Sequence, residues 1–239
     1  NATLSYYYHY ALLSVGGELM AAFETSLAPV SLSPIVMEAV FLGADQQQIT
    51  TFLLPVQANN HPIYNPSLDY SVYLSQPFFF VLFQILILLT TVYTVGIEIK
   101  FRTATDWLAT AKGNMITAVL GKLLPYTFIY ILIGWLGNYV MFGILHIPFQ
   151  GSWWLINMIT VLFVIATQAL GLFIFSLFPA VSLVISVVSM VGSLGATLSG
   201  VTFPVSNMYP LVRDASYLFP VRHFTEMIQT MLYGGGGFI

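Results

Sequence analysis

Four uninterrupted apolar stretches, none of which contains Lys, Arg, Asp or Glu, follow the first third of the chain. They cover residues 77–97, 123–145, 153–178 and 181–201. About 20 apolar residues in a helix cross the roughly 30 Å hydrocarbon layer of a bilayer. Uninterrupted runs indicate helices, because barrel strands alternate apolar and polar residues. We therefore predict an all-α polytopic membrane protein with four transmembrane helices in a membrane region over residues 77–201.

The first 76 residues are more polar and contain two different patterns. Residues 54–64 are bounded by Pro and Asn and suit a strand or an extended link that returns to the membrane. Ser33-Pro34 fits the start of a helix. Apolar residues also recur at helical spacing near the start of the chain, at Leu4, Tyr8, Leu12, Val15, Leu19 and Phe23. We interpret residues 1–76 as the remnant of an external (periplasmic) α/β domain.

The basic residues are concentrated in one loop. Four of the six Lys and Arg residues lie within residues 98–122, whereas residues 1–76 contain five acidic residues and no Lys or Arg. Cytoplasmic loops of membrane proteins are enriched in Lys and Arg, so we predict that the loop 98–122 is cytoplasmic. Residues 1–76 and 202–239 are then external, with Arg213 and Arg222 as a mild exception.

The composition agrees with a membrane protein and narrows the chemistry. Hydrophobic residues make up 58% of the chain and charged residues 6%, whereas about a quarter of a soluble domain is charged. The sequence has no cysteine and its four histidines are scattered, which argues against disulfides and metal sites. Gly121-Lys122 lacks the other residues of a nucleotide-binding loop. We expect no catalytic residue, no metal, no cofactor bound by this chain and no nucleic-acid partner.

The loop 98–122 carries the pattern of a short helix. It contains a capping box, two adjacent apolar residues, a cation for the last turn and a glycine that can end the helix, namely Thr103, Asp106, Trp107, Leu108, Lys112 and Gly113. The helix would be about 15 Å long, and a helix this short needs a surface to pack on. That surface is either the inner leaflet of the membrane or a partner protein.

The fourth apolar stretch is rich in small residues, which allow membrane helices to approach each other closely. The candidates for such a face are Ser189, Gly192, Ser193, Gly195, Ser199 and Gly200. Packing within one subunit explains them, and so does a face that lines a substrate path or a dimer seam. Their spacing does not separate these alternatives.

A further amphipathic helix is predicted after Pro220, which is suited to the first helical position. Its apolar face contains Val221, Phe224, Ile228 and Met231, and its polar face contains Arg222, His223, Glu226 and Gln229. We expect an i,i+4 ion pair between Arg222 and Glu226. The helix would be interfacial or re-entrant on the outer side.

Short motifs along residues 55–237 resemble the type-2 ATP-binding-cassette (ABC) permease family, in its bacterial exporter branch with a large external domain. The motifs keep the family's order relative to the spans: Tyr64-Asn65-Pro66, Glu98 with Thr103, Leu108 and Thr110, Gly121-Lys122-Leu123-Leu124-Pro125-Tyr126, Ser199-Gly200, Phe203-Pro204 and Tyr217-Leu218-Phe219-Pro220. The chain departs from the family pattern at Arg102, where Gly is common, and at Ala111, where Pro is common.

The resemblance implies six spans per permease, so we expect one span before and one after the four in this chain. It implies a dimer with a second permease copy or paralogue, on separate cytoplasmic ABC ATPase subunits that bind and hydrolyse ATP. Thr103 to Lys112 would be the coupling helix, with Trp107 and Leu108 as apolar anchors at the ATPase. Membrane lipid and a periplasmic adaptor are further expected partners.

The predicted function is therefore that of a non-enzymatic membrane subunit of an ATP-driven exporter in the bacterial inner membrane. The resemblance favours small amphipathic or drug-like substrates. Two alternatives stay open, namely an ATP-independent carrier or channel and a membrane scaffold that transports nothing. Transport by the full-length chain alone would indicate the first alternative.

Overall fold

The computed structural model describes residues 2–9, 21–22, 25, 41, 56–63, 70–147, 149, 151–178, 180–201, 205 and 208–232. The chain divides into two compact units, Asn1–Tyr73 and Leu74–Ile239. We describe each unit by itself.

The first unit contains two strands, β1 (Ala2–His9) and β2 (Val56–Ile63). They pair in parallel, with Ala2 opposite Val56 and His9 opposite Ile63. Residues 54–64 were predicted to form a strand or an extended link, and the structure shows a strand there. The helical prediction for Leu4 and Tyr8 is wrong, because this segment, with three consecutive tyrosines, pairs as a strand with residues more than 50 positions away. The predictions at Leu12, Val15, Leu19, Phe23 and Ser33-Pro34 lie outside the described residues.

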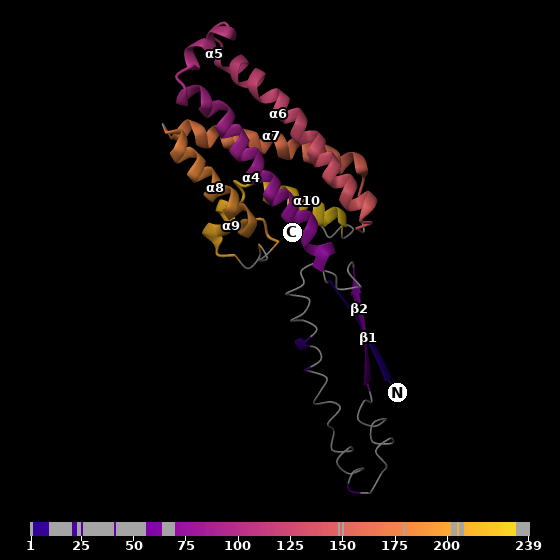
Figure 1. Ribbon diagram of the computed structural model, residues 1–239. Coiled ribbons are helices and arrows are strands. Elements are labelled where there is room, and N and C mark those ends of the chain that lie inside the picture. Colours follow the sequence, from indigo (N-terminus) through magenta and orange to yellow (C-terminus); the bar gives the residue numbers. More distant parts are fainter. Residues whose placement is uncertain are drawn as a thin grey trace. The chain divides into compact units, whose positions relative to one another are not determined.

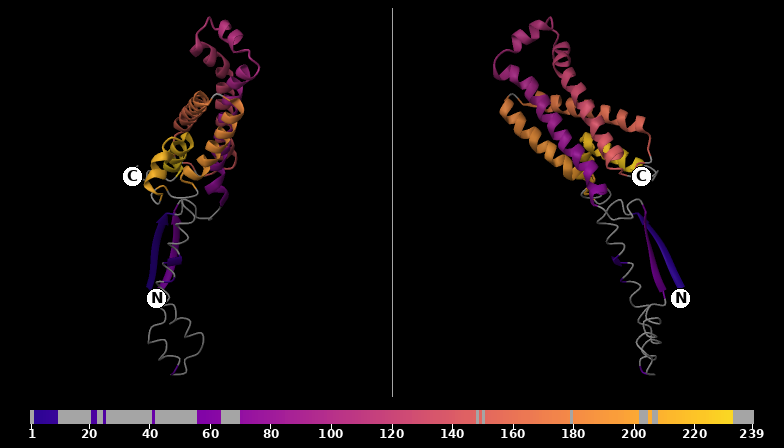
Figure 2. Two further views of the ribbon diagram at one scale, coloured as in Figure 1. Left: turned by 90° about the vertical axis from the view of Figure 1, so that its left-hand side faces the viewer. Right: turned by 45° about the vertical axis from the view of Figure 1, so that its right-hand side comes forward.

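The second unit is helical, and Figure 1 shows its elements in order, with two further views in Figure 2. They are α4 (Tyr70–Lys100), α5 (Ala104–Thr110), α6 (Met115–Asn138), the π-helical turn η1 (Tyr139–Ile144), α7 (Trp153–Leu177), α8 (Val181–Leu198), α9 (Pro210–Ser216) and α10 (Pro220–Leu232). The short helix α5 lies at one end of the bundle, between the end of α4 and the start of α6.

Four helices of the described chain are long and apolar enough to cross a membrane, which confirms the four predicted spans. They cover Leu74–Lys100, Met115–Ile144, Trp153–Leu177 and Val181–Leu198. The second helix begins eight residues earlier than its apolar stretch, because Lys122 marks the edge of the apolar stretch and not the end of the helix. Asn114 caps this earlier start by accepting hydrogen bonds from Ile116 N (3.0 Å) and Thr117 N (3.2 Å).

Helix α4 forms the centre of the bundle. In its most apolar window 56% of the residues are buried, compared with 17% for α6, which therefore lies at the periphery. One core cluster joins α4, α7 and α8 through Leu88, Val92, Ile174, Val184 and Val188. A second contact brings in α10, where the ring centroids of Phe80 and Phe224 lie 3.9 Å apart.

The predicted apolar face of α10 is confirmed, since Val221, Phe224 and Ile228 are buried. The assignment of Arg222 to the exposed polar face is wrong. Its guanidinium is buried and donates from Nη1 to Arg213 O (2.9 Å) and to Ser216 Oγ, at the carboxyl end of α9.

A helix carboxyl end attracts a cation, and Arg222 also lies 3.7 Å from the Tyr217 ring centroid. The ion pairs of the described residues do not include the expected pair with Glu226.

Candidate functional site

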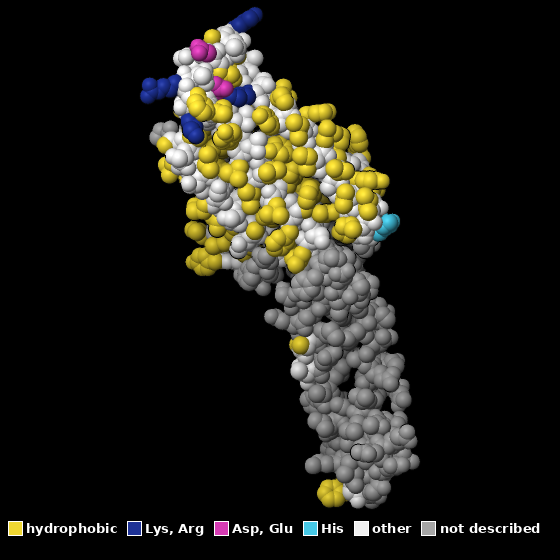
Figure 3. Space-filling model, in the orientation of Figure 1, with side chains coloured by type: hydrophobic (Ala, Val, Ile, Leu, Met, Phe, Trp, Pro, Cys, Tyr) yellow, Lys and Arg dark blue, Asp and Glu magenta, His cyan; other side chains and the backbone are white. Residues whose placement is uncertain are grey.

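Charged side chains gather at the end of the second unit that contains α5. The four cations here are Lys100 at the end of α4, Arg102 and Lys112 on either side of α5, and Lys122 in the first turns of α6. In the space-filling view, Lys and Arg side chains project from this end, while hydrophobic side chains cover the helices beside it (Figure 3). On this face of the molecule, the charged end thus differs in chemistry from the apolar surface of the helices beside it.

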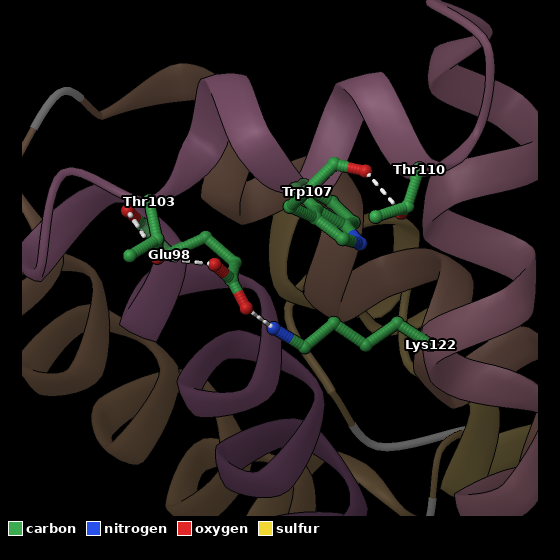
Figure 4. Close-up of polar contacts among 5 residues, drawn as sticks. All are labelled: Glu98, Thr103, Trp107, Thr110 and Lys122. Atoms are coloured by element: carbon green, nitrogen blue, oxygen red, sulfur yellow. Dashed lines mark hydrogen bonds and ion pairs between the residues drawn. The ribbon is translucent and has the colours of Figure 1, made fainter.

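A single carboxylate connects three helices at the charged end. Glu98, near the end of α4, forms an ion pair with Lys122 of α6 and accepts a hydrogen bond from the hydroxyl of Thr103, which precedes α5 (Figure 4). The Glu98 and Lys122 side chains are 18% and 21% exposed, so both are largely shielded from water. We call Glu98, Thr103, Trp107 and Lys122 the elbow junction.

Trp107 completes the elbow junction. The Lys122 ammonium lies 5.2 Å from the centroid of the indole ring, within the range of a cation–π interaction. An isolated surface ion pair contributes little to stability, but Lys122 here has a carboxylate on one side and an aromatic ring on the other. The arrangement specifies the orientation of α5 relative to both spans.

The helix α5 differs from its prediction in two respects. The prediction of a capping box is wrong, because the Thr103 hydroxyl makes no hydrogen bond to the backbone of α5 and instead donates to the carboxylate of Glu98. The helix has seven residues and is about 10 Å long, so Lys112 lies beyond its last turn and not within it.

The chain leaves α5 through left-handed conformations at Lys112 (φ 53°) and Gly113 (φ 79°). Arg102, a position at which the resemblance leads us to expect Gly, is also left-handed (φ 59°). Gly adopts this backbone conformation without strain.

The outward face of α5 consists of two polar residues and one alanine. Thr105, Asp106 and Ala109 are exposed, whereas Trp107 and Leu108 are half-buried. The indole of Trp107 lies beside Lys122 and not on the outward face (Figure 4). An open groove of about 390 Å³ separates α5 from α6, with Trp107 on one side and Gly121 on the other.

Sequence reasoning missed Glu98 and Lys122 as site residues. Both residues belong to the short motifs on which the family resemblance rests, and these motifs could have pointed to them. The ion pair itself joins residues 24 positions apart, and no local sequence pattern predicts such a contact.

The small residues of α8 divide into two groups. Gly192 and Gly195 are buried against α4, where a Cβ atom would lie 2.8 Å from Ile85 Cγ1 and 2.5 Å from Gln84 Nε2 respectively. Ser189 and Ser193 are exposed, and their hydroxyls donate to carbonyls of their own helix. The glycines therefore serve helix packing.

The last two small residues lie where α8 ends. Ser199 is buried and donates to Ala196 O (2.7 Å), and Gly200 is left-handed (φ 87°). A path-lining role for the exposed serines stays a prediction.

Polar side chains inside the bundle pair with one another across helices. Gln84 Oε1 accepts from the backbone amide of Val221 (3.0 Å) in the first turn of α10. Asn138 Nδ2 donates to Thr160 Oγ1 (2.9 Å), and Thr127 Oγ1 donates to Gln168 Oε1 (2.7 Å). Hydrogen bonds of this kind hold membrane helices together.

A comparison of the sequence with models of protein families identifies the family of this chain. Residues 1–239 match the family described as "ABC-2 family transporter protein". The chain belongs to the ABC-2 transporter family. Together with its four apolar helices, this membership makes it a multi-pass membrane protein of that family.

Two curated relatives were found for this ABC-2 family member. The probable multidrug ABC transporter permease YbhS of Escherichia coli K12 is 29% identical over 121 residues, which cover 49% of this chain and 31% of the relative. The protein of the same description from E. coli O157:H7 gives the same values. The match thus spans less than a third of the relatives' length. No solved structure matches significantly.

The elbow junction predicts energetic coupling between Glu98 and Lys122. We expect Glu98→Gln and Lys122→Met each to lower the thermal stability of the detergent-purified ABC-2 protein, and the double variant to be no worse than the more damaging single variant. The reason is that either change alone leaves the other charge without its partner. Additive losses in this double-mutant cycle would contradict a direct pair.

The close approach of α8 to α4 predicts a difference between two glycine substitutions. Gly192→Ala brings a methyl group against Ile85, whereas Gly121→Ala meets nothing within 4 Å. Both substitutions gain the same helix propensity, that of alanine, so the difference between the variants reports packing alone. We expect the free energy of unfolding of Gly192→Ala to be about 1–3 kcal/mol lower than that of Gly121→Ala, because the added methyl group overpacks the contact with Ile85. Equal thermal stability of the two variants in detergent would contradict the packing role.

Proposed function

We propose that this chain is part of the membrane-spanning permease subunit of an ATP-driven exporter, and that α5 is its coupling helix. The observation that carries the proposal is the elbow junction, in which Glu98 connects the only short helix between α4 and α6 in the described chain to both of those spans. A movement of α5 is thereby transmitted to two spans at once.

The distribution of charge supports an energy source outside this chain. The charged residues of the four described spans, Glu98, Lys100 and Lys122, lie at the charged end. Farther along the spans the strongly polar side chains include Gln84, Asn138 and Gln168, each held by at least one hydrogen bond. Ion-coupled and proton-coupled carriers usually use ionisable groups within the membrane.

The mechanism we propose begins on the outward face of α5. Thr105, Asp106 and Ala109 contact a separate cytoplasmic ABC ATPase, which binds and hydrolyses ATP. Trp107 and Leu108 support this face from the side of the bundle. Closure of the ATPase pair moves α5, and the elbow junction turns that movement into a rigid-body displacement of α4 and α6.

Other features of the proposed exporter come from its family and relatives. The relatives' description as multidrug permeases supports small amphipathic or drug-like substrates, moved out of the cytoplasm or the inner membrane of a bacterium. We propose a dimer with a second permease copy or paralogue, and contact with a periplasmic adaptor. The exposed serines of α8, Ser189 and Ser193, are candidates for the substrate path.

Substitution of Trp107 tests the coupling role. We expect Trp107→Ala to lower substrate-stimulated ATP hydrolysis about tenfold, equivalent to about 1.4 kcal/mol of coupling free energy, because Lys122 loses its aromatic partner and α5 its support. Hydrolysis is measured with the full-length permease reconstituted in liposomes with its ATPase subunit. Trp154→Ala is the matched control, since this tryptophan is 73% exposed in the first turn of α7.

Equal activity of wild type and Trp107→Ala would refute the coupling role of Trp107. Transport by the permease without any ATPase would identify a carrier or channel. Binding of a partner without substrate-stimulated hydrolysis would identify a scaffold.

A further inference from the structure

A second cavity lies at the charged end, between the last turns of α4 and the first turn of α8. Its volume is about 380 Å³, which is within the range of small-molecule sites in proteins. Ile97 of α4 and Val181 and Ile185 of α8 form an aliphatic wall. The two helices come close beside this wall, since a Cβ atom on Gly96 would lie 2.9 Å from Val181 Cγ1.

Polar groups and one cation also line this cavity. Lys100, the last residue of α4, lines it together with Tyr93 and Ser182, whose side chains carry hydroxyl groups. The ion pairs among the described residues involve Lys122 and Arg213 and do not include Lys100. Its ammonium lies 5.8 Å from the Phe101 ring centroid. The cavity thus combines an apolar wall with one available cation.

We propose that this cavity binds an anionic phospholipid from the leaflet that α5 faces. The phosphate lies at Lys100, and one acyl chain lies along Ile97, Val181 and Ile185. Lysine at the end of a membrane helix extends its ammonium to the depth of the lipid phosphates, so the membrane itself supplies the matching anion at this position. A protein occupant would have to supply both a carboxylate and an apolar segment.

The position of the site relates it to the elbow junction. Lys100 follows Glu98 by two residues in the same helix, so a lipid bound between α4 and α8 stabilises the end of the helix from which the junction is built. This site concerns the membrane and does not depend on an ATPase partner. It is therefore separable from the proposed export function.

The test compares lipid binding by variants of the full-length protein purified in neutral detergent. Native mass spectrometry measures retained phosphatidylglycerol against phosphatidylcholine. We expect Lys100→Gln to weaken phosphatidylglycerol binding about fivefold, the effect of one lysine's attraction to an anionic membrane surface. Lys100→Arg should retain binding. Ile185→Trp should displace the acyl chain and reduce binding without changing any charge.

Arg102→Gln is the matched control, because Arg102 is an exposed cation two residues from Lys100 that does not line the cavity. We expect it to change phosphatidylglycerol binding by less than about twofold, since its charge lies outside the site. An equal loss in Arg102→Gln and Lys100→Gln would overturn the proposal in favour of diffuse surface charge.

Two other results would also overturn the proposal. If soluble glycerol phosphate displaced phosphatidylglycerol and bound with the same affinity as the whole lipid, the apolar wall would contribute nothing to binding. Unchanged lipid binding in Ile185→Trp, together with a changed oligomeric state, would show that a second copy of the chain fills the cavity.

Discussion

The hydrocarbon interior of a membrane offers no water, so the backbone polar groups of a span must find their partners within the protein. Threonine hydroxyls in the bundle donate to carbonyls one turn earlier, as Thr91 does to Ile87 O and Thr167 to Phe163 O, both at 2.7 Å. Gln84 meets the same requirement for α10, because it accepts from an amide in the first turn of that helix. The buried amphipathic helix can thereby pack among the apolar spans.

The same constraint places the charged residues of the four spans at the charged end. The two lysines among them have different partners. Lys122 turns inward to Glu98 and Trp107 and fixes the short helix α5 to the spans. Lys100 lines the cavity between α4 and α8 and belongs to neither of the ion pairs found among the described residues. The ion pair of Lys122 with Glu98 fixes the geometry of the elbow junction, whereas the ammonium of Lys100 is available to membrane lipids. The outward face of α5, with two polar residues and one alanine, suits a water-soluble partner.

Properties that depend on local composition could be predicted from the sequence, and contacts between distant residues could not. The four spans, the extended segment within 54–64 and the apolar face of α10 follow from hydropathy and periodicity. Strand β1 was missed because its pairing with β2 is non-local.

The errors at the site have the same origin. The burial of Arg222 depends on the carboxyl end of α9, and the loss of the Thr103 cap depends on Glu98 at the end of another helix. The inward position of Trp107 depends on Lys122, which is 15 positions away. For the same reason, the pairing of Glu98 with Lys122 could not be predicted from the sequence.

The most direct test of the central claim is whether the outward face of α5 contacts an ATPase subunit. These 239 residues contain no cysteine, so a single Ala109→Cys introduces one reactive thiol into this part of the protein at an exposed position of α5. The account predicts that a photo-cross-linker, attached to this cysteine through a maleimide and activated to insert into nearby C–H bonds, joins this variant to the co-purified ATPase. The same reagent on Leu132→Cys, on the exposed apolar surface of α6, should not. An assembled complex with no cross-link at Ala109→Cys, or with equal cross-linking at both positions, would contradict it.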